Sequence, residues 1–587
     1  MIALTLFRFA IITCWLSLTV TSISSSNSFS RLPTHVRGGS LAAEAIAADI
    51  ASDVYLREHF KLDDSWTSNS SSNYKVTTLD HFNTTSNATF SQRFFFDTTF
   101  CGGITNCSLP STPIICEFTG EWTASGTPGG AAAELAARIG ALTVTLEHRG
   151  YGCSHFAGGC SPPLAMDNVP YLSVEQAVED AADFVPFFEA FAANNFSAPL
   201  NFPLEITPGF IPARRWGIVG GSYAGAFVTW ATVRHGDLFV ATWASSGVVN
   251  AIFNFSGFDA TVAAAVGDDC ANALRAVTAA FEDAFDTRNA ELYALFNASA
   301  TGPTGFSRTD FAWMLADSAG MAPQYGAKAT MCLFLNSTAR DTPSSPSPPN
   351  ANNFLTGWSA LEAFAQWTGY RYGVNFGASC YYSTACLSGG DPTYFSDGTT
   401  WVLQCCNELA YWNINSNGGT RSALITSDYF ISQCNAAFGA TVRPDTAAFN
   451  SRFGGALPLV PSSSNVFAVQ GSDDPWQSAG VQSPISSNYR ELTATCSGCS
   501  HCRDLSGTNS ASDPPELTAV RTAVLDQMTA WMTNPSPSSS SSSSLSTSAI
   551  VGIVVGAGVG IAVLAYLTFR GPKEVSSVPR YNALASK

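Results

Sequence analysis

The chain has 587 residues, of which 46% are hydrophobic and only 12% are charged. This composition excludes a disordered protein, because a chain of this length and apolar content can bury a sizeable core. Twenty-eight Lys and Arg against 44 Asp and Glu give a net charge of −16, which argues against nucleic acid as a partner, since phosphate backbones are bound through basic patches.

The amino-terminal residues have the pattern of a secretory signal peptide. Residues 1–25 contain one cation, Arg8, followed by an apolar run over residues 9–20 and then small residues, which is the order found in cleavable signals. An uncleaved anchor is the alternative, although the apolar run is short for a membrane span. Residues 26–74 are expected to form an amino-terminal segment ahead of the folded body.

The central part of the chain predicts an α/β protein, because apolar β-branched runs alternate with helical patterns. Residues 75–250 and 431–534 are expected to form one domain in two parts. Residues 251–430 are richer in aromatic residues, cysteines and helical spacing, and we expect them to be an inserted helical cap. The expected strands are residues 114–118, 142–147, 216–220, 241–245 and 466–470, and the expected helices are residues 173–192 and 226–234.

Ser222 is the candidate nucleophile. It lies in Gly220-Gly-Ser-Tyr-Ala-Gly225, between an expected strand and an expected helix, and small neighbours permit the sharp turn that exposes a nucleophilic hydroxyl. The start of the helix also offers backbone N–H groups to an oxyanion. The strict Gly-x-Ser-x-Gly pattern is not met, since Ala224 takes the last position, and a tight turn without catalytic use is the alternative.

The expected partners of Ser222 follow it in the chain. A triad on such a sheet has Ser, Asp and His in this order, and His501 is the one histidine after the expected insertion. Asp473 and Asp474 come directly after the strand expected at residues 466–470, so either carboxylate is placed to orient the imidazole.

The carboxyl-terminal end changes composition twice. Residues 535–548 are almost entirely serine and proline and predict an unpacked stalk. Residues 549–569 are uncharged and long enough to cross a bilayer, and the tail at residues 570–587 carries cations, which predicts a single-pass type I membrane protein. A GPI signal is disfavoured, because polar residues follow the apolar stretch. Gly552, Gly556 and Gly560 have the spacing that pairs two such helices, which would give a homodimer.

Sixteen cysteines and eight Asn-x-Ser/Thr sequons indicate a disulfide-bonded glycoprotein of the secretory pathway, either lumenal, as in a vacuole or lysosome, or extracellular. Cysteines at 496, 499 and 502 surround His501 and leave zinc as an alternative, but disulfides are expected in an oxidising compartment. No other metal or cofactor motif is present, so no cofactor is expected. The predicted glycosylation sites are Asn69, Asn83, Asn87, Asn106, Asn195, Asn254, Asn297 and Asn336.

Five stretches in this order resemble the S28 serine peptidases. They cover roughly residues 75–530 and are Leu79-Asp-His-Phe-Asn83 with Phe90-Ser-Gln-Arg-Phe94, Glu147-His-Arg-Gly-Tyr-Gly152, the stretch around Ser222, Asp474-Pro-Trp476 and His501-Cys-Arg-Asp-Leu505. The resemblance implies the α/β-hydrolase fold with an inserted helical cap, which this family calls the SKS domain.

The resemblance also implies roles for particular residues. Ser222 would be the nucleophile, Asp474 the orienting acid and His501 the base. The Tyr223 N–H and a group near Gly120 would bind the oxyanion, and Trp476 would line the pocket for the residue before the cleaved bond.

The expected substrates are therefore proline-containing peptides or proteins. S28 peptidases cleave after proline, or after alanine in some cases, usually in acidic compartments, and we favour exopeptidase over endopeptidase action. Two alternatives of other classes stay open: a binding or adhesion glycoprotein that has lost its activity, and an esterase or lipase. The charged residues at 147–149, with Asp80, His81 and Arg93, are interpreted as buried supports; for residues 147–149 the alternative is recognition of a substrate terminus.

Overall fold

The computed structural model describes residues 72–534, except residues 161–165, 197–209, 303–304, 337–352, 374–379, 390–396, 440–442 and 510–511. The predicted signal peptide at residues 1–25, the stalk at 535–548, the membrane span at 549–569 and the tail at 570–587 lie outside the described residues. Among the helices that are described, none combines the length and the apolar character needed to cross a bilayer.

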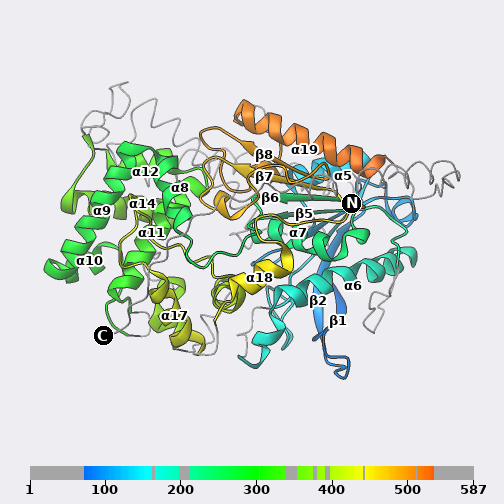
Figure 1. Ribbon diagram of the computed structural model, residues 1–587, viewed down its shortest axis with the longest axis horizontal. Coiled ribbons are helices and arrows are strands. Elements are labelled where there is room, and N and C mark those ends of the chain that lie inside the picture. Colours follow the sequence, from blue (N-terminus) through cyan, green and yellow to red (C-terminus); the bar gives the residue numbers. More distant parts are fainter. Residues whose placement is uncertain are drawn as a thin grey trace, which may run out of the picture. The chain divides into compact units, whose positions relative to one another are not determined.

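An eight-stranded sheet forms the centre of the fold (Figure 1). Strand β2 runs antiparallel to both of its neighbours, and every other neighbouring pair is parallel. In spatial order the strands are β1 (Asn73–Thr78), β2 (Thr89–Asp97), β4 (Leu142–Leu146), β3 (Ile114–Phe118), β5 (Trp216–Gly221), β6 (Ala241–Ser245), β7 (Val466–Gly471) and β8 (Tyr489–Ala494).

The five predicted strands are confirmed as β3 to β7, each within one residue at either end. The predicted helix at residues 173–192 is α6 (Val174–Ala193), with Ser173 as its N-cap. The predicted helix at 226–234 is α7, which starts earlier, at Tyr223, and ends at His235. A mostly parallel sheet whose fifth strand leads through a sharp turn into a helix is the α/β-hydrolase arrangement.

Helices cover both faces of the sheet because successive strand residues point to opposite sides. Ile115, Val219 and Trp243 pack with α5 (Gly130–Ile139) and α19 (Pro515–Thr533) on one face. Their chain neighbours Cys116 and Ile218 pack with α6 and α7 on the other face. The core strands are therefore buried on both sides, which explains why their sequences are mostly apolar.

Between β6 and β7 the described residues form helices and no further strand of the sheet. Most of these helices bury their apolar residues in a cluster of their own, separate from the two clusters beside the sheet. The domain limits at residues 251 and 430 stay predictions. The helices are α8 (Ser256–Val266), α9 (Asp268–Thr287), α10 (Asn289–Leu295), α11 (Arg308–Gln324), α12 (Lys328–Leu335), α14 (Gly357–Tyr372), α15 (Thr384–Ser388), α16 (Asp397–Gln404), α17 (Ser427–Phe438) and α18 (Thr446–Phe453).

Six disulfides connect twelve cysteines of the described chain. Cys496 and Cys499 are bonded to each other, so two of the three sulfurs around His501 are not available as zinc ligands. Cys406 pairs with Cys434, while the neighbouring Cys405 keeps its thiol; adjacent cysteines do not bond to each other here, since such a bond is strained.

The predicted glycosylation sites differ in exposure. Asn83, Asn87, Asn106, Asn195, Asn254 and Asn297 are exposed, so each can carry a glycan without disturbing the fold. Asn336 is 1% exposed, and this burial argues against a glycan there, because the bulky sugar would displace the packing around it. Asn69 lies outside the described residues.

Candidate active site

Ser222 occupies a strained turn between β5 and α7. Its backbone has φ 62° and ψ −127°, a region that side chains other than glycine rarely adopt. A Cβ on Gly220 would lie 2.3 Å from the carbonyl oxygen of Ala224, and one on Gly225 would lie 2.6 Å from that of Ser245. The small residues around Ser222 are therefore required by close backbone contacts, which is the condition for a nucleophile elbow.

Asp474 and His501 form a buried pair directly after β7. The imidazole Nδ1 lies 2.8 Å from Oδ2 of Asp474, and both side chains are at most 1% exposed. Oδ1 of Asp474 accepts a hydrogen bond of 2.9 Å from the Trp476 N–H. Burial favours the neutral imidazole, but the Asp474 carboxylate outweighs it and holds the pKa of His501 well above its usual value. Of the two carboxylates that the sequence left open, Asp474 is the one that contacts His501.

The segments that carry Ser222 and His501 are in contact. A Cβ on Gly221 would lie 3.0 Å from Sγ of Cys502, and the Cys502 N–H donates a 2.9 Å hydrogen bond to Oγ of Ser246. Nε2 of His501 is buried, and no hydrogen-bond partner for it occurs in the described part of the chain. The structure thus brings the two segments together without a hydrogen bond from Ser222 to the imidazole, which is common in unliganded hydrolases.

Gly120 lies against the start of α7. A Cβ at Gly120 would be 3.2 Å from the Ala224 nitrogen and 3.3 Å from Cδ1 of Tyr223. Backbone N–H groups at the first turn of a helix have no partner within the helix and point toward its N-terminal end. Gly120 and Tyr223 are therefore brought together beside Ser222, and their use as oxyanion donors stays a prediction.

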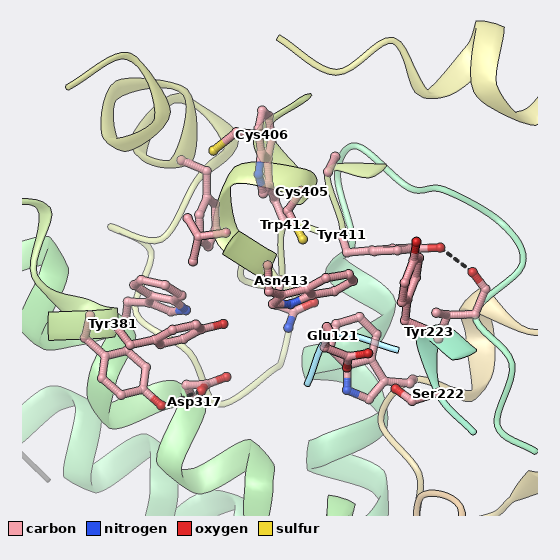
Figure 2. Close-up of a pocket in the computed structure, with 18 of the residues that line it drawn as sticks. Glu121, Ser222, Tyr223, Asp317, Tyr381, Cys405, Cys406, Tyr411, Trp412 and Asn413 are labelled. Atoms are coloured by element: carbon pink, nitrogen blue, oxygen red, sulfur yellow. Dashed lines mark hydrogen bonds between the residues drawn. The ribbon is translucent and has the colours of Figure 1, made fainter. Parts of the chain in front are cut away.

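A cavity of about 240 Å³ opens beside Ser222, and Figure 2 shows side chains from the sheet domain and the inserted helices around it. We call it the Ser222 cavity. The ring of Trp476 lines it and packs against the rings of Phe255, Phe258 and Tyr411. The sequence analysis did not identify most of the other lining residues, because they belong to the insertion and no recognisable motif surrounds them. The aromatic enrichment after residue 250 was the one sequence feature that pointed to them.

The charged residues after β4 are confirmed as buried supports. Glu147 accepts hydrogen bonds from Arg93, from Oγ of Ser154 and from two backbone N–H groups. Arg149 binds both carboxylate oxygens of Asp180. The Asp180 carboxylate also accepts a hydrogen bond from His81. Because these charges are paired, removing one partner would leave an uncompensated charge in the interior.

Asp504 connects the His501 loop to the sheet. Its carboxylate accepts hydrogen bonds from Nε1 of Trp243, at 2.8 Å, and from Oγ of Ser245. Both of these residues lie in β6. A second connection comes from the insertion, since the His501 N–H donates to the Gln324 carbonyl at 3.0 Å and Nζ of Lys328 lies 2.7 Å from Oδ1 of Asp473. The loop is held from both sides, which fixes the imidazole.

The chain is similar in sequence to known proteins over most of its length. Residues 77–524 match the family model described as Serine carboxypeptidase S28. The chain is 28% identical to the Arabidopsis thaliana protein called probable serine protease EDA2 over 472 residues, which is 78% of this chain and 87% of the relative. It is 26% identical to the thymus-specific serine protease of Mus musculus over 485 residues, covering 77% and 86%. A probable extracellular serine carboxypeptidase of Arthroderma benhamiae is 27% identical over 412 residues, covering 63% and 54%.

Proposed function

Because the chain belongs to the serine carboxypeptidase S28 family of serine peptidases, we propose that it hydrolyses peptide bonds after proline, or after alanine, through Ser222, His501 and Asp474. The observation that carries this assignment is the buried contact of 2.8 Å between His501 and Asp474, in a loop packed against the strained turn of Ser222. An orienting carboxylate of this kind fixes the imidazole tautomer and stabilises the imidazolium.

The proposed reaction has two steps. Oγ of Ser222 attacks the carbonyl carbon, and Nε2 of His501 takes the hydroxyl proton and returns it to the leaving amine. The tetrahedral oxyanion is held by backbone donors at Tyr223 and near Gly120. Water then hydrolyses the acyl-enzyme with His501 again as the base.

The preference for proline is proposed from the walls of the Ser222 cavity. Trp476, Tyr411 and Trp401 offer ring faces there, and a rigid apolar ring without an N–H is selected by shape and buried area. The small cavity also supports exopeptidase action, since about 240 Å³ is below the range of pockets that hold drug-sized ligands. The Arthroderma benhamiae relative is named as a serine carboxypeptidase, which is a kind of exopeptidase.

We further propose that the enzyme works on the lumenal or extracellular side of a membrane, anchored by residues 549–569. Six disulfides and a relative named as extracellular support the secretory route.

The experiment compares wild type with Ser222→Ala on proline-containing peptides between pH 4 and 7. We expect the substitution to lower kcat by roughly 10⁶, as in other serine hydrolases, while circular dichroism shows an unchanged fold. A fluorophosphonate probe should label the wild-type chain at Ser222. Ester hydrolysis without peptide cleavage would favour an esterase, and labelling and turnover both absent would favour a binding glycoprotein.

A further inference from the structure

Buried hydrogen bonds converge on the hydroxyl of Tyr223, the residue after Ser222. Nε2 of His148 lies 2.9 Å from this hydroxyl, and Nε2 of Gln404 lies 2.6 Å from it. The Tyr151 hydroxyl donates to Oε1 of Gln404 at 2.7 Å. All four side chains belong to residues that are at most 4% exposed. We call them the Tyr223 network: His148, Tyr151, Tyr223 and Gln404.

The direction of each bond in the network follows from one carbonyl. The Arg149 carbonyl, 2.7 Å from Nδ1 of His148, can only accept, so Nδ1 carries the proton. In a neutral imidazole Nε2 is then an acceptor, and the Tyr223 hydroxyl donates to it. Because this hydroxyl has one proton, the Gln404 group in contact with it is the NH2 group, which donates. The Gln404 oxygen is therefore free to accept from Tyr151.

The groups at the centre of the network are neutral over most of the acidic range. Burial raises the pKa of Tyr223 well above its usual value and lowers the pKa of His148 to about 4. A protonated Nε2 cannot accept a hydrogen bond, so neutral His148 is the form that holds the Tyr223 hydroxyl. The network is therefore complete at pH values above about 4.

The network connects the insertion to the sheet through α16. Gln404 is the last residue of this helix. The first residue, Asp397, accepts from the Thr123 hydroxyl at 2.6 Å and from the Gly152 N–H at 3.0 Å. The helix is thus attached at its start to the loops after β3 and β4, and at its end to Tyr223.

Tyr223 lies at the two groups that are predicted to bind the oxyanion. Its own N–H is in the first turn of α7, where backbone N–H groups have no acceptor within the helix. Its ring atom Cδ1 is 3.3 Å from the position that a Cβ on Gly120 would take. Both Tyr223 and Ser222 line the Ser222 cavity (Figure 2). Any movement of the Tyr223 ring would therefore disturb both groups beside the nucleophile.

We propose that His148 and Gln404 are positioning residues, which hold the Tyr223 hydroxyl and thereby fix the Tyr223 N–H and Gly120 where the oxyanion forms. The assignment rests on the proposed peptidase function and gives the insertion a second role, since α16 completes the site as well as covering it. Neither His148 nor Gln404 lines the cavity, so both act through Tyr223. Donors that are fixed before the reaction stabilise the developing charge without reorganisation.

The test compares Gln404→Leu and Tyr223→Phe with wild type, as purified full-length proteins, on a proline-containing peptide that wild type cleaves. We expect each substitution to lower kcat by roughly 10- to 100-fold at an unchanged KM, because displacing an oxyanion donor costs less than removing it. The double variant should lose about as much as one single variant, since both substitutions remove the same contact.

Tyr293→Phe is the matched control. The Tyr293 hydroxyl is also buried and donates to the Phe306 carbonyl at 2.6 Å, but Tyr293 does not line the cavity. Its loss should lower the melting temperature and leave kcat unchanged.

His148 permits a rescue by a conservative replacement. A glutamine side chain reaches the position of Nε2 and can accept from Tyr223, whereas the shorter asparagine reaches only the position of Nδ1 and the Arg149 carbonyl. His148→Gln should therefore retain most of the wild-type kcat, and His148→Asn should lose as much as Gln404→Leu.

Alanyl-prolinal tests the oxyanion directly. Oγ of Ser222 adds to the aldehyde carbon, His501 takes the hydroxyl proton, and the carbonyl oxygen becomes the oxyanion of a tetrahedral adduct. In Gln404→Leu the Ki of this aldehyde should rise by the factor by which kcat/KM falls. Alanyl-prolinol has an alcohol in place of the aldehyde and forms no adduct, so its Ki should not change. Both inhibitors are used with a free or an acetylated amino end, whichever inhibits wild type.

Three results would overturn the proposal. Wild-type kcat in Gln404→Leu and Tyr223→Phe would make the network purely structural. An equal rise in Ki for the aldehyde and the alcohol would place the effect on substrate binding. Equal losses of kcat in His148→Gln and His148→Asn would exclude the bond to Tyr223 as the cause. If Tyr223→Phe does not fold, the Gln404 and His148 variants decide. Each of these results leaves cleavage by wild type intact, whereas no cleavage of any peptide by wild type would reject the proposed function itself.

Discussion

Asp473 and Asp474 are neighbours in the chain with different partners. Asp474 contacts Nδ1 of His501, while Asp473 binds Nζ of Lys328 at 2.7 Å and accepts from the Gly498 N–H at 2.7 Å. The first carboxylate acts on the imidazole, and the second holds α12 to the loop after β7. Substituting Asp474 alone therefore tests the orientation of the imidazole, and substituting Asp473 alone tests the attachment of the inserted helices.

Asp474→Asn should lower kcat/KM by about 10³ to 10⁴, because an amide at this position favours the wrong imidazole tautomer. Asp473→Asn should leave the imidazole contact in place and mainly lower the melting temperature. Steady-state kinetics with one peptide and thermal unfolding of both variants provide the comparison. Equal losses of activity in the two variants would contradict the assignment of Asp474.

Glu121 lines the Ser222 cavity, and burial raises its pKa to about 7, so its ionisation should affect the pH profile. His501 lowers the pKa of Glu121, and because electrostatic coupling is reciprocal, ionised Glu121 raises the pKa of His501. Asp474 acts in the same direction, while Tyr325, whose ring centroid is 6.4 Å from that of His501, stays neutral because its pKa is well above 10. A general base acts when neutral, so activity rises with pH through the pKa of His501.

Glu121→Gln removes one negative charge and should therefore move the acid limb of kcat/KM to lower pH. The profile is measured with an ester substrate that has no ionisable group, so that only groups of the enzyme contribute to the limb. Glu408→Gln is the matched control and should leave the limb in place, because Glu408 is a buried carboxyl whose pKa is also raised to about 7 but does not line the cavity. A shift of the limb to higher pH would contradict the coupling.

The residues of the proposed triad could be identified from the sequence, while most of the cavity could not. Ser222, Asp474 and His501 each follow a strand or stand in a distinctive local context. Asp317 and Tyr381 lie in helical regions far from any such context, and only the packing of the insertion over the sheet brings them to the cavity. A local sequence pattern can reveal a strained turn such as the one at Ser222. It does not reveal which segments, distant along the chain, come into contact in the fold.

At the scale of elements, two helical glycines have opposite roles. In α7, a Cβ at Gly225 would come within 2.6 Å of the Ser245 carbonyl, whereas one at Gly369 in α14 would meet nothing within 4 Å. The first glycine permits α7 to approach β6, and the second leaves a helix position unfilled.

Gly225→Ala should destabilise the protein by about 3 kcal/mol, because backbone atoms must move to admit the methyl group. It should also reduce activity by displacing Ser222. Gly369→Ala should instead stabilise by up to about 1 kcal/mol through helix propensity. Urea unfolding of both variants measures whether each substitution lowers or raises the free energy of unfolding. A stable, fully active Gly225→Ala variant would contradict the close approach of α7 to β6.

The missed strands show why apolar patterns find some elements and not others. Strands β3 to β7 are buried on both faces apart from the partly exposed Glu117, so their sequences are mostly apolar. Strands β1 and β2 contain Lys75 and Gln92, which are buried but satisfied by Thr77 and by the Glu147 carbonyl. Strand β8, at one edge of the sheet, alternates buried and exposed residues only in part. Hydrogen bonds within β1 and from β2 to the loop after β4 satisfy these buried polar side chains, and no apolar pattern reveals such strands.

At the scale of the whole molecule, α19 both covers the sheet and holds the loop that follows His501. Val524, Leu525 and Met528 are at most 1% exposed in the core shared with α5. Arg521 donates to the carbonyls of Asp504 and Arg503, at 3.1 Å each, in the loop that follows His501. The side chain of Arg215 binds the carbonyls of Trp531 and Asn534 at the end of the helix.

These contacts predict where the chain can be shortened. A chain that ends at Asn534 keeps every contact of α19 and should retain the kcat/KM of the full-length protein, while losing the predicted membrane span at residues 549–569. A chain that ends at Pro514 exposes the core under α19 and releases the loop after His501, so it should fail to fold. Membrane fractionation and peptide kinetics separate the cases: full-length protein should require detergent for release and the chain ending at Asn534 should not. Full-length protein recovered in the soluble fraction would rule out the anchor and leave the peptidase assignment unaffected, because all residues of the site precede Asn534.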